Sequence, residues 1–105
     1  MLLFKPEHIE PILAGTKTKT RRIWKRQRVK EGSVQLAKTK MLSTEYFAKL
    51  RILGVKKRKL GQMIEAEAER EGYMSLTEYK AAWEKINGTS WDPDQEVLVV
   101  SFEVV

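Results

Sequence analysis

Apolar and polar residues alternate along several short segments of the chain, a pattern that predicts β-strands. Residues 46–55 show it most clearly, because Ala48, Leu50 and Ile52 fall on one side and charged residues fall on the other. Gly54 interrupts this segment and is expected to mark a bulge. The other predicted strands cover residues 2–4, 16–24, 33–38 and 97–104.

Three further segments have the apolar spacing of helices. They cover residues 6–15, 62–71 and 75–87. Pro11 lies inside the first and is expected to break it or delay its start. Ser75 and Glu78 form a capping box at the start of the third, and Met74 with Tyr79 fits a hydrophobic staple. Short strands with a few helices predict an α+β fold built around a small barrel rather than a parallel sheet.

The composition limits the classes of protein to which the chain can belong. Its 105 residues fit one domain, and a hydrophobic content of 42% supports a compact core. No apolar run approaches the ~20 residues that span a bilayer, and the N-terminus MLLFKPEH lacks the shape of a signal peptide. The chain has no cysteine, which excludes disulfides, thiolate catalysis and zinc–thiolate sites. We therefore expect a cytoplasmic protein with no membrane association.

The net charge of +6 is distributed unevenly. Residues 1–60 carry 17 Lys and Arg against 4 Glu, a net charge of +13, whereas residues 61–105 carry 3 against 10 Asp and Glu, a net charge of −7. A small domain polarised in this way can present a basic face to nucleic acid or phosphate. The alternative is a solvated surface that is merely rich in lysine.

Two basic runs are candidates for contacts with RNA phosphates. The run KRQRVK follows Trp24, whose ring offers a stacking surface beside the cations, and the run KKRK comes later in the chain. The candidate contacts in these runs are Lys25, Arg26, Arg28, Lys56, Lys57 and Arg58.

The segment GTKTKTRR, residues 15–22, concentrates hydroxyl and cationic groups. One interpretation is an edge strand kept soluble by lysine. However, the segment leaves a helix end at Gly15, and functional sites are often built at such junctions. In a regular strand Lys17 and Thr20 would face opposite sides, so they can share a pocket only if residues 16–17 still form a turn.

Glu71 is a carboxylate on an apolar helix face. Ile64, Ala68 and Glu71 have the spacing i, i+4, i+7, so Glu71 is expected to point inward. It also falls in the last helical turn, where a negative charge opposes the helix dipole. Such a residue has either a structural ion-pair partner or a functional role.

Other catalytic sets are weakly represented or absent. His8 is the only histidine and is expected on an exposed helix face. Glu67 and Glu71 are four residues apart, but two carboxylates without His or Cys make at best a weak magnesium site. We therefore expect neither a resident metal nor a cofactor.

The 15–22 segment resembles the motif of the ASCH family, G-x-K-x-x-E/T-x-R, which falls here on Gly15, Lys17, Thr20 and Arg22. The elements ILAG, AEREGY, TEYKAAWEKING and WDPDQEVLVVSFE follow the order of that family over nearly the whole chain. The resemblance implies one ASCH domain over residues 1–105. It also implies a small PUA-like β-barrel with flanking helices, a cleft beside the motif and an association with RNA.

Within that family the chain is similar to small 4-acetylcytidine amidohydrolases. Matched position by position, this similarity implies catalysis by Lys17, Thr20 and Glu71, with hydrolysis of the acetyl amide to cytidine and acetate. Tyr73 is an insertion relative to that group, and the two basic runs also depart from it, which favours a larger RNA over a free nucleoside.

The remaining residues of the segment are expected to bind rather than react. We assign substrate binding to Gly15, Arg22 and Trp24 and an RNA contact to Arg21. The expected partner is RNA or a modified nucleoside, and the expected state is a monomer or a weak homodimer. The alternative function is a non-catalytic RNA-binding module. A ribonuclease is the third and least supported function, because the chain has no pair of histidines and no convincing metal set.

Overall fold

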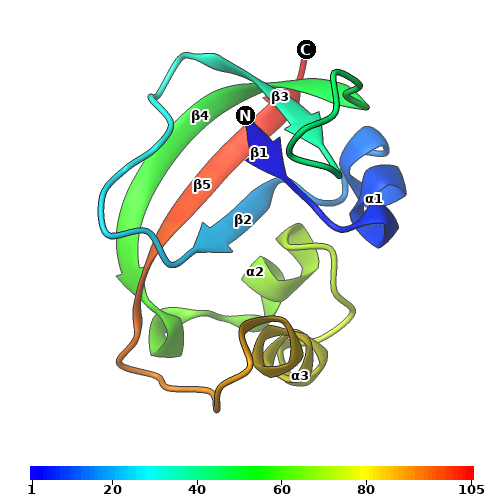
Figure 1. Ribbon diagram of the computed structural model, residues 1–105. Coiled ribbons are helices and arrows are strands. Elements are labelled where there is room, and N and C mark those ends of the chain that lie inside the picture. The colour runs from blue at the N-terminus through cyan, green and yellow to red at the C-terminus, as the bar shows by residue number, and fades with distance from the viewer.

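The computed structural model describes residues 1–105 and shows a curled five-stranded sheet with helices packed at one end and beside one edge (Figure 1). The strand order is β1-β3-β4-β5-β2. Only β1 and β3 run parallel; every other neighbouring pair is antiparallel. The strands are β1 (Leu2–Leu3), β2 (Lys19–Arg22), β3 (Val34–Lys38), β4 (Ala48–Lys59) and β5 (Glu96–Val104). The α+β class and the partly closed barrel agree with the prediction.

The first two helices are shorter than the sequence pattern predicts, whereas the third matches it. They are α1 (Ile9–Leu13), α2 (Glu65–Arg70) and α3 (Leu76–Asn87), and 3₁₀ turns over Pro6–His8 and Leu60–Gln62 precede α1 and α2. Pro11 is accommodated because it lies in the first turn of the late-starting α1, where its missing N–H has no intrahelical acceptor. None of these helices is long and apolar enough to cross a membrane.

Two apolar clusters hold the sheet and helices together. One fills the inside of the curl, and the other lies between the sheet, α2 and α3. β5 contributes to both, because Val100 and Phe102 belong to the first cluster while Val97 and Val99 belong to the second. A strand buried on both faces reads as a nearly continuous apolar run, which is how residues 97–100 read.

β4 confirms the clearest strand prediction and extends it. Ala48, Leu50 and Ile52 are buried, and the pairing with β5 shifts register between Ile52 and Gly54, which confirms the bulge. The strand then continues to Lys59, so the KKRK run belongs to a strand rather than a loop.

The helix ends are partly as predicted. Ser75 Oγ accepts a hydrogen bond from the Glu78 backbone N–H at 3.1 Å, which confirms the N-cap of α3. The predicted staple is wrong, because Met74 is 85% exposed. Ile64 is also exposed, because α2 begins only at Glu65 and Ile64 is its N-cap.

Candidate functional site

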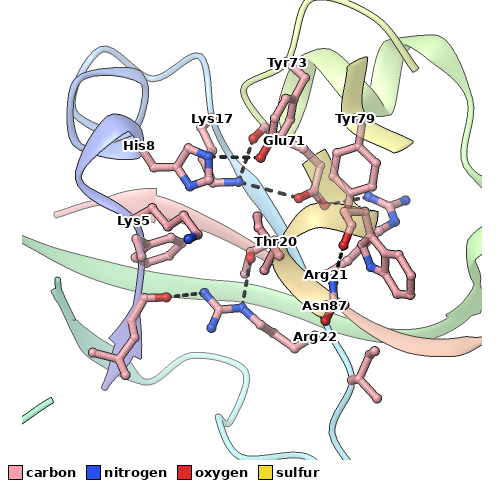
Figure 2. A pocket seen from close by; sticks show the side chains of 15 residues that line it. Lys5, His8, Lys17, Thr20, Arg21, Arg22, Glu71, Tyr73, Tyr79 and Asn87 are labelled. Carbon is pink, nitrogen blue, oxygen red and sulfur yellow. Dashed lines mark hydrogen bonds and ion pairs between the residues drawn. The ribbon is translucent and has the colours of Figure 1, made fainter. Parts of the chain in front are cut away.

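A cavity of about 270 Å³ lies at the free edge of β2, between the barrel and the helices α2 and α3 (Figure 2). β2 provides Thr20 and Arg22, the turn before it provides Lys17, and the end of α2 provides Glu71. These side chains come from segments about 50 positions apart in the sequence. The cavity is therefore a product of the fold rather than of one local motif.

A turn after α1 delivers Lys17 to the cavity. Gly15 adopts a φ of 80°, which reverses the chain, and the backbone N–H groups of Thr16 and Lys17 both donate to the Pro11 carbonyl at 3.0 Å. β2 begins only at Lys19. Residues 16–17 are thus a turn, and this geometry satisfies the condition for Lys17 and Thr20 to line the same cavity.

The Lys17 ammonium is buried among oxygen acceptors. Its Nζ donates to the Glu71 backbone carbonyl at 2.6 Å and to the Lys19 carbonyl at 3.1 Å, and lies 3.6 Å from Glu71 Oε1. Lys17 and Glu71, which the resemblance assigns to one site, are therefore in contact. Burial lowers the pKa of the Lys17 amine, and the Glu71 carboxylate offsets part of this shift. A lysine in this position can reach the neutral form more easily than one in water.

Glu71 follows the last residue of α2 and points inward. Its side chain is 3% exposed, and its Oε2 accepts a hydrogen bond from Arg21 Nη1 at 2.7 Å. Burial raises the pKa of the Glu71 carboxyl, whereas the cations of Lys17 and Arg21 act in the opposite direction. The predicted inward orientation of Glu71 is confirmed.

Arg21 is buried in an ion-pair network rather than placed on the surface. Its Nη2 donates to Glu67 Oε2 at 2.7 Å while its Nη1 holds Glu71, and its Nε has no hydrogen-bond partner. Although burial acts in the opposite sense, the Arg21 guanidinium lowers the pKa of the Glu67 carboxyl. The structure thus gives Arg21 two carboxylate partners and little surface with which to contact RNA. The pairing also connects Glu67 to the site, although Glu67 does not line the cavity, and the Glu67 and Glu71 carboxylates both bind the Arg21 guanidinium.

Thr20 lies beside a second arginine. Arg22 Nε donates to Thr20 Oγ1 at 3.0 Å, and Arg22 Nη2 donates to the Leu3 carbonyl at 2.6 Å. The Arg22 guanidinium also lies 5.1 Å from the centroid of the Phe4 ring. These contacts hold a positive charge against the Thr20 hydroxyl, where it can stabilise developing negative charge on the oxygen.

An aromatic wall completes the cavity. The Tyr73 ring packs edge-on against the Tyr79 ring, with the ring centroids 5.2 Å apart. The Tyr73 hydroxyl lies 3.3 Å from His8 Nε2. His8 was expected on an exposed helix face; it is instead half-buried in the cavity wall. Burial is the main cause that lowers the pKa of His8 to about 4, so its ring is neutral at pH 7. Sequence reasoning missed Tyr73 and His8 as site residues, and no local pattern brings them together.

Comparisons with known proteins agree with this architecture. No protein-family model and no curated protein matches the sequence. Among solved structures, an ASCH domain from Lactobacillus crispatus has a TM-score of 0.74 at 19% identity, covering 91% of this chain and 69% of its own. The chain has an ASCH-domain fold.

Two other solved structures are similar to this chain in fold. A protein from Enterococcus faecalis, assigned to the family DUF984, has a TM-score of 0.64 at 19% identity, covering 94% of this chain and 67% of its own. The hypothetical protein PH0355 has a TM-score of 0.71 at 21% identity, covering 97% of this chain and 94% of its own. These similarities support the predicted fold.

Within the ASCH-domain fold the motif residues separate into two groups. Lys17, Thr20 and Arg22 line the cavity, whereas Gly15 only shapes the turn before it. Trp24 does not line the cavity either, because it packs against the barrel core with the Arg28 guanidinium 5.8 Å from its ring centroid.

The cations of the two basic runs lie at the surface. Lys25, Arg26 and Arg28 are exposed in the connection between β2 and β3. The cations of the KKRK run, at residues 56–59, are exposed along β4 and alternate between the two faces of the sheet. The cations of the second run therefore lie on two separate surfaces and do not form one patch.

Proposed function

We propose that the protein acts on RNA or on a nucleoside derived from RNA, and that the cavity at the edge of β2 hydrolyses the acetyl amide of 4-acetylcytidine. The observation that carries this proposal is the buried contact of 3.6 Å between Lys17 Nζ and Glu71 Oε1 in the cavity that Thr20 lines. Together these residues supply a hydroxyl nucleophile, a basic amine and a group that positions the amine. The aromatic wall of the cavity suits a planar base.

Thr20 would provide the nucleophile. Its hydroxyl attacks the acetyl carbonyl while its proton passes to the neutral Lys17 amine. The tetrahedral intermediate carries an oxyanion, which the Arg22 guanidinium is placed to stabilise because it already contacts Thr20 Oγ1. Lys17 then returns the proton to the departing N4 amine of cytidine, leaving an acetyl ester on Thr20. Water attacks this ester while Lys17 takes a proton from it. Lys17 then returns this proton to the Thr20 oxygen as the ester bond breaks, and acetic acid leaves and ionises to acetate.

Glu71 would position Lys17 and stabilise its protonated form during each transfer. Arg21 holds Oε2 of the carboxylate, which leaves Oε1 facing the amine. For the first transfer Lys17 must exchange one of its two carbonyl contacts for the Thr20 hydroxyl, since no hydrogen bond joins these side chains. Substrate binding in the cavity would drive that exchange.

A non-catalytic RNA-binding module is the second candidate. The specific observation in its favour is that both reactive groups are already occupied: Lys17 donates to two carbonyls, and Thr20 accepts from Arg22. In this function the cavity holds a base, and the surface cations contact phosphates.

One assay separates the two candidates. The protein is incubated with 4-acetylcytidine, cytidine is followed by chromatography, and binding of the nucleoside is measured in parallel. Release of cytidine in proportion to enzyme supports the hydrolase. Saturable binding without any cytidine above the background of a heat-inactivated sample would reject it in favour of the binding module.

A further inference from the structure

A second hollow, of about 90 Å³, lies on the face of the sheet that α2 and α3 cover. It is lined mainly by polar groups from three adjacent strands: Lys19 from β2, Lys56 and Arg58 from β4, and Ser101 from β5. Glu67 of α2 is the only acidic residue that lines it. None of the residues proposed for the hydrolytic reaction contributes to this hollow.

The strand register explains why the cations converge there. Lys19 pairs with Ser101, and Lys56 pairs with Val99 across β4 and β5. Residues paired across a sheet point to the same face, and Val99 belongs to the apolar cluster beneath the helices. Lys19 and Lys56 therefore point to the helix-covered face, and Arg58 follows two positions later on the same face.

One cation of the opposite face has an acidic partner, whereas two cations of the hollow have none. Lys57 Nζ lies 3.9 Å from Glu96 Oε2. Lys56 and Arg58, its neighbours in sequence, have no carboxylate within 4.0 Å. Glu67 does not neutralise them, because its Oε2 is held at 2.7 Å by Arg21 and lies 3.9 Å from Lys19. The hollow thus contains two unpaired cations beside a carboxylate that is already paired.

The bulge in β4 leaves space between these cations. Gly54 lines the hollow opposite Ser101, and a Cβ added there would meet no heavy atom within 4 Å. A volume of about 90 Å³ exceeds the roughly 30 Å³ share of one water molecule, which leaves room for a small anion. The Ser101 hydroxyl can donate a hydrogen bond, and a guanidinium fork such as that of Arg58 matches the geometry of phosphate oxygens.

We propose that the hollow formed by Lys19, Gly54, Lys56, Arg58 and Ser101 binds a phosphate group. The hollow adjoins the hydrolytic cavity, since Glu67 on its wall is bonded to Arg21, which lines the cavity. If the cavity accepts a nucleoside as proposed above, a phosphate held here belongs to the same nucleotide strand. The phosphate site itself does not depend on turnover in the cavity.

The test compares two charge-matched double variants. Lys56→Glu with Arg58→Glu reverses both cations of the hollow, and Lys57→Glu with Lys59→Glu makes the same change in net charge on the opposite face. Gly54→Asp is a third variant, which adds one carboxylate at the hollow from a position where the backbone is not in the left-handed region and a Cβ meets no heavy atom within 4 Å. Thermal melting verifies that each variant is folded.

Three probes identify the source of the phosphate: inorganic phosphate, cytidine 5′-monophosphate and a fluorescent single-stranded RNA. Binding of the small probes is followed by NMR shifts of the Gly54 and Ser101 amides, and binding of RNA by anisotropy at several salt concentrations. We expect the hollow variants to weaken binding by about tenfold or more and to reduce the salt slope by about 1.4, whereas the opposite-face variant changes both far less. Binding of the small probes but not of RNA would assign the site to a free phosphate or mononucleotide.

Two results would overturn the phosphate site: equal weakening by the two double variants, or no shift of Gly54 and Ser101 with any probe. Hydrolysis of 4-acetylcytidine, which carries no phosphate, should be unchanged in the hollow variants. A failure of the hydrolase proposal therefore leaves this measurement intact, and a failure of the phosphate site leaves the hydrolase assay intact.

Discussion

Arg21 and Glu71 form a buried ion pair in which Arg21 Nη1 donates to Glu71 Oε2 at 2.7 Å. The two side chains are 2% and 3% exposed. Because a guanidinium keeps its proton at any ordinary pH, Glu71 always has a cationic partner beside it. That partner occupies one carboxylate oxygen and leaves the other facing Lys17. Arg21 therefore determines the orientation of the carboxylate without taking part in the proposed reaction.

Arg21→Met should destabilise the protein by about 3 kcal/mol, because it leaves Glu71 as a buried charge that has lost its hydrogen-bonded partner. Urea unfolding measures the change. Glu67→Gln removes the more exposed partner of Arg21 and should cost about 1 kcal/mol or less. In a Glu71→Gln background the loss caused by Arg21→Met should shrink, since the buried charge is gone. Losses that simply add across the double variant would contradict the buried pair.

The sequence was sufficient where a pattern is local and regular. Ala48, Leu50 and Ile52 were predicted to share the buried face of a strand, and they do, because side-chain direction in a strand alternates with every residue. Ser75 was predicted as an N-cap from the spacing to Glu78 alone, and the hydrogen bond is present. Glu71 was predicted to point inward from helical spacing, and this is also correct.

The sequence was insufficient where the answer depends on contacts between distant segments. Ile64 shares the spacing of Glu71 but is 60% exposed, because α2 is too short to extend the apolar face to that position. Arg21 lies on the face of β2 opposite Thr20, as the alternation of side chains along a strand requires. However, the burial of Arg21 depends on α2, which packs beside this edge strand and supplies the Glu67 and Glu71 carboxylates that pair with the guanidinium. His8 and Tyr73 are 65 positions apart in the sequence, and they too are in contact only because distant segments pack together.

Thr20→Val should abolish release of cytidine, because valine keeps the shape of the side chain and removes the hydroxyl. The fold should survive, since Thr20 lies on the edge strand and makes one side-chain hydrogen bond, to Arg22. Thr18→Val is the matched control: Thr18 precedes β2, does not line the cavity, and should retain activity. Chromatography of the product gives both rates. Residual turnover in Thr20→Val close to that of Thr18→Val would exclude Thr20 as the nucleophile.

Stability should fall as the pH is lowered from about 6.5 toward 4, in part because of His8. Burial holds the pKa of His8 in the folded protein at about 4, against 6.5 for an unperturbed histidine. In this range the unfolded chain therefore binds a proton that the folded protein does not, and folding loses free energy as the pH falls. His8 is only half-buried, so the loss should be on the order of 1 kcal/mol.

His8→Gln tests this effect, because glutamine keeps a polar side chain but does not titrate. Urea midpoints of the wild type and the variant are compared at pH 7, 6 and 5, and the variant should show the flatter dependence. Tyr73→Phe removes the hydroxyl beside His8 but keeps the imidazole, so it should retain the wild-type slope. Parallel curves for the wild type and His8→Gln would show that His8 does not titrate with folding.

The exposed run after Trp24 should contribute to RNA affinity without sequence preference. Replacing Lys25, Arg26 and Arg28 by Ala should weaken binding to several single-stranded RNAs to a similar degree. If all three contact phosphates, the slope of log affinity against log salt should fall by about 2. Lys40→Ala with Lys85→Ala removes exposed cations elsewhere and is the control for net charge. If the salt slope changes by the same amount per removed charge in both variants, residues 25–28 are not a specific contact surface for RNA.

Lys17→Arg distinguishes a base from a fixed positive charge. Arginine holds its proton at every relevant pH, so the variant cannot accept the proton of Thr20, and release of cytidine should be lost. In a binding module the retained charge should preserve much of the nucleoside affinity. Because the amine is buried against the Glu71 and Lys19 carbonyls, the larger guanidinium can also disturb packing. Lys17→Met removes the charge while keeping the length of the side chain, and provides the comparison.

The two Lys17 variants are measured for folding, for nucleoside affinity and for turnover. The hydrolase predicts that Lys17→Arg binds 4-acetylcytidine and does not hydrolyse it, while Lys17→Met fails to hydrolyse it whether or not it binds. For the wild type, turnover should rise with pH as the Lys17 amine loses its proton, and burial places this rise below the usual range of a lysine pKa. A Lys17→Arg variant that folds and hydrolyses at the wild-type rate would show that the Lys17 amine is not the base. The contact with Glu71 would then be a structural ion pair.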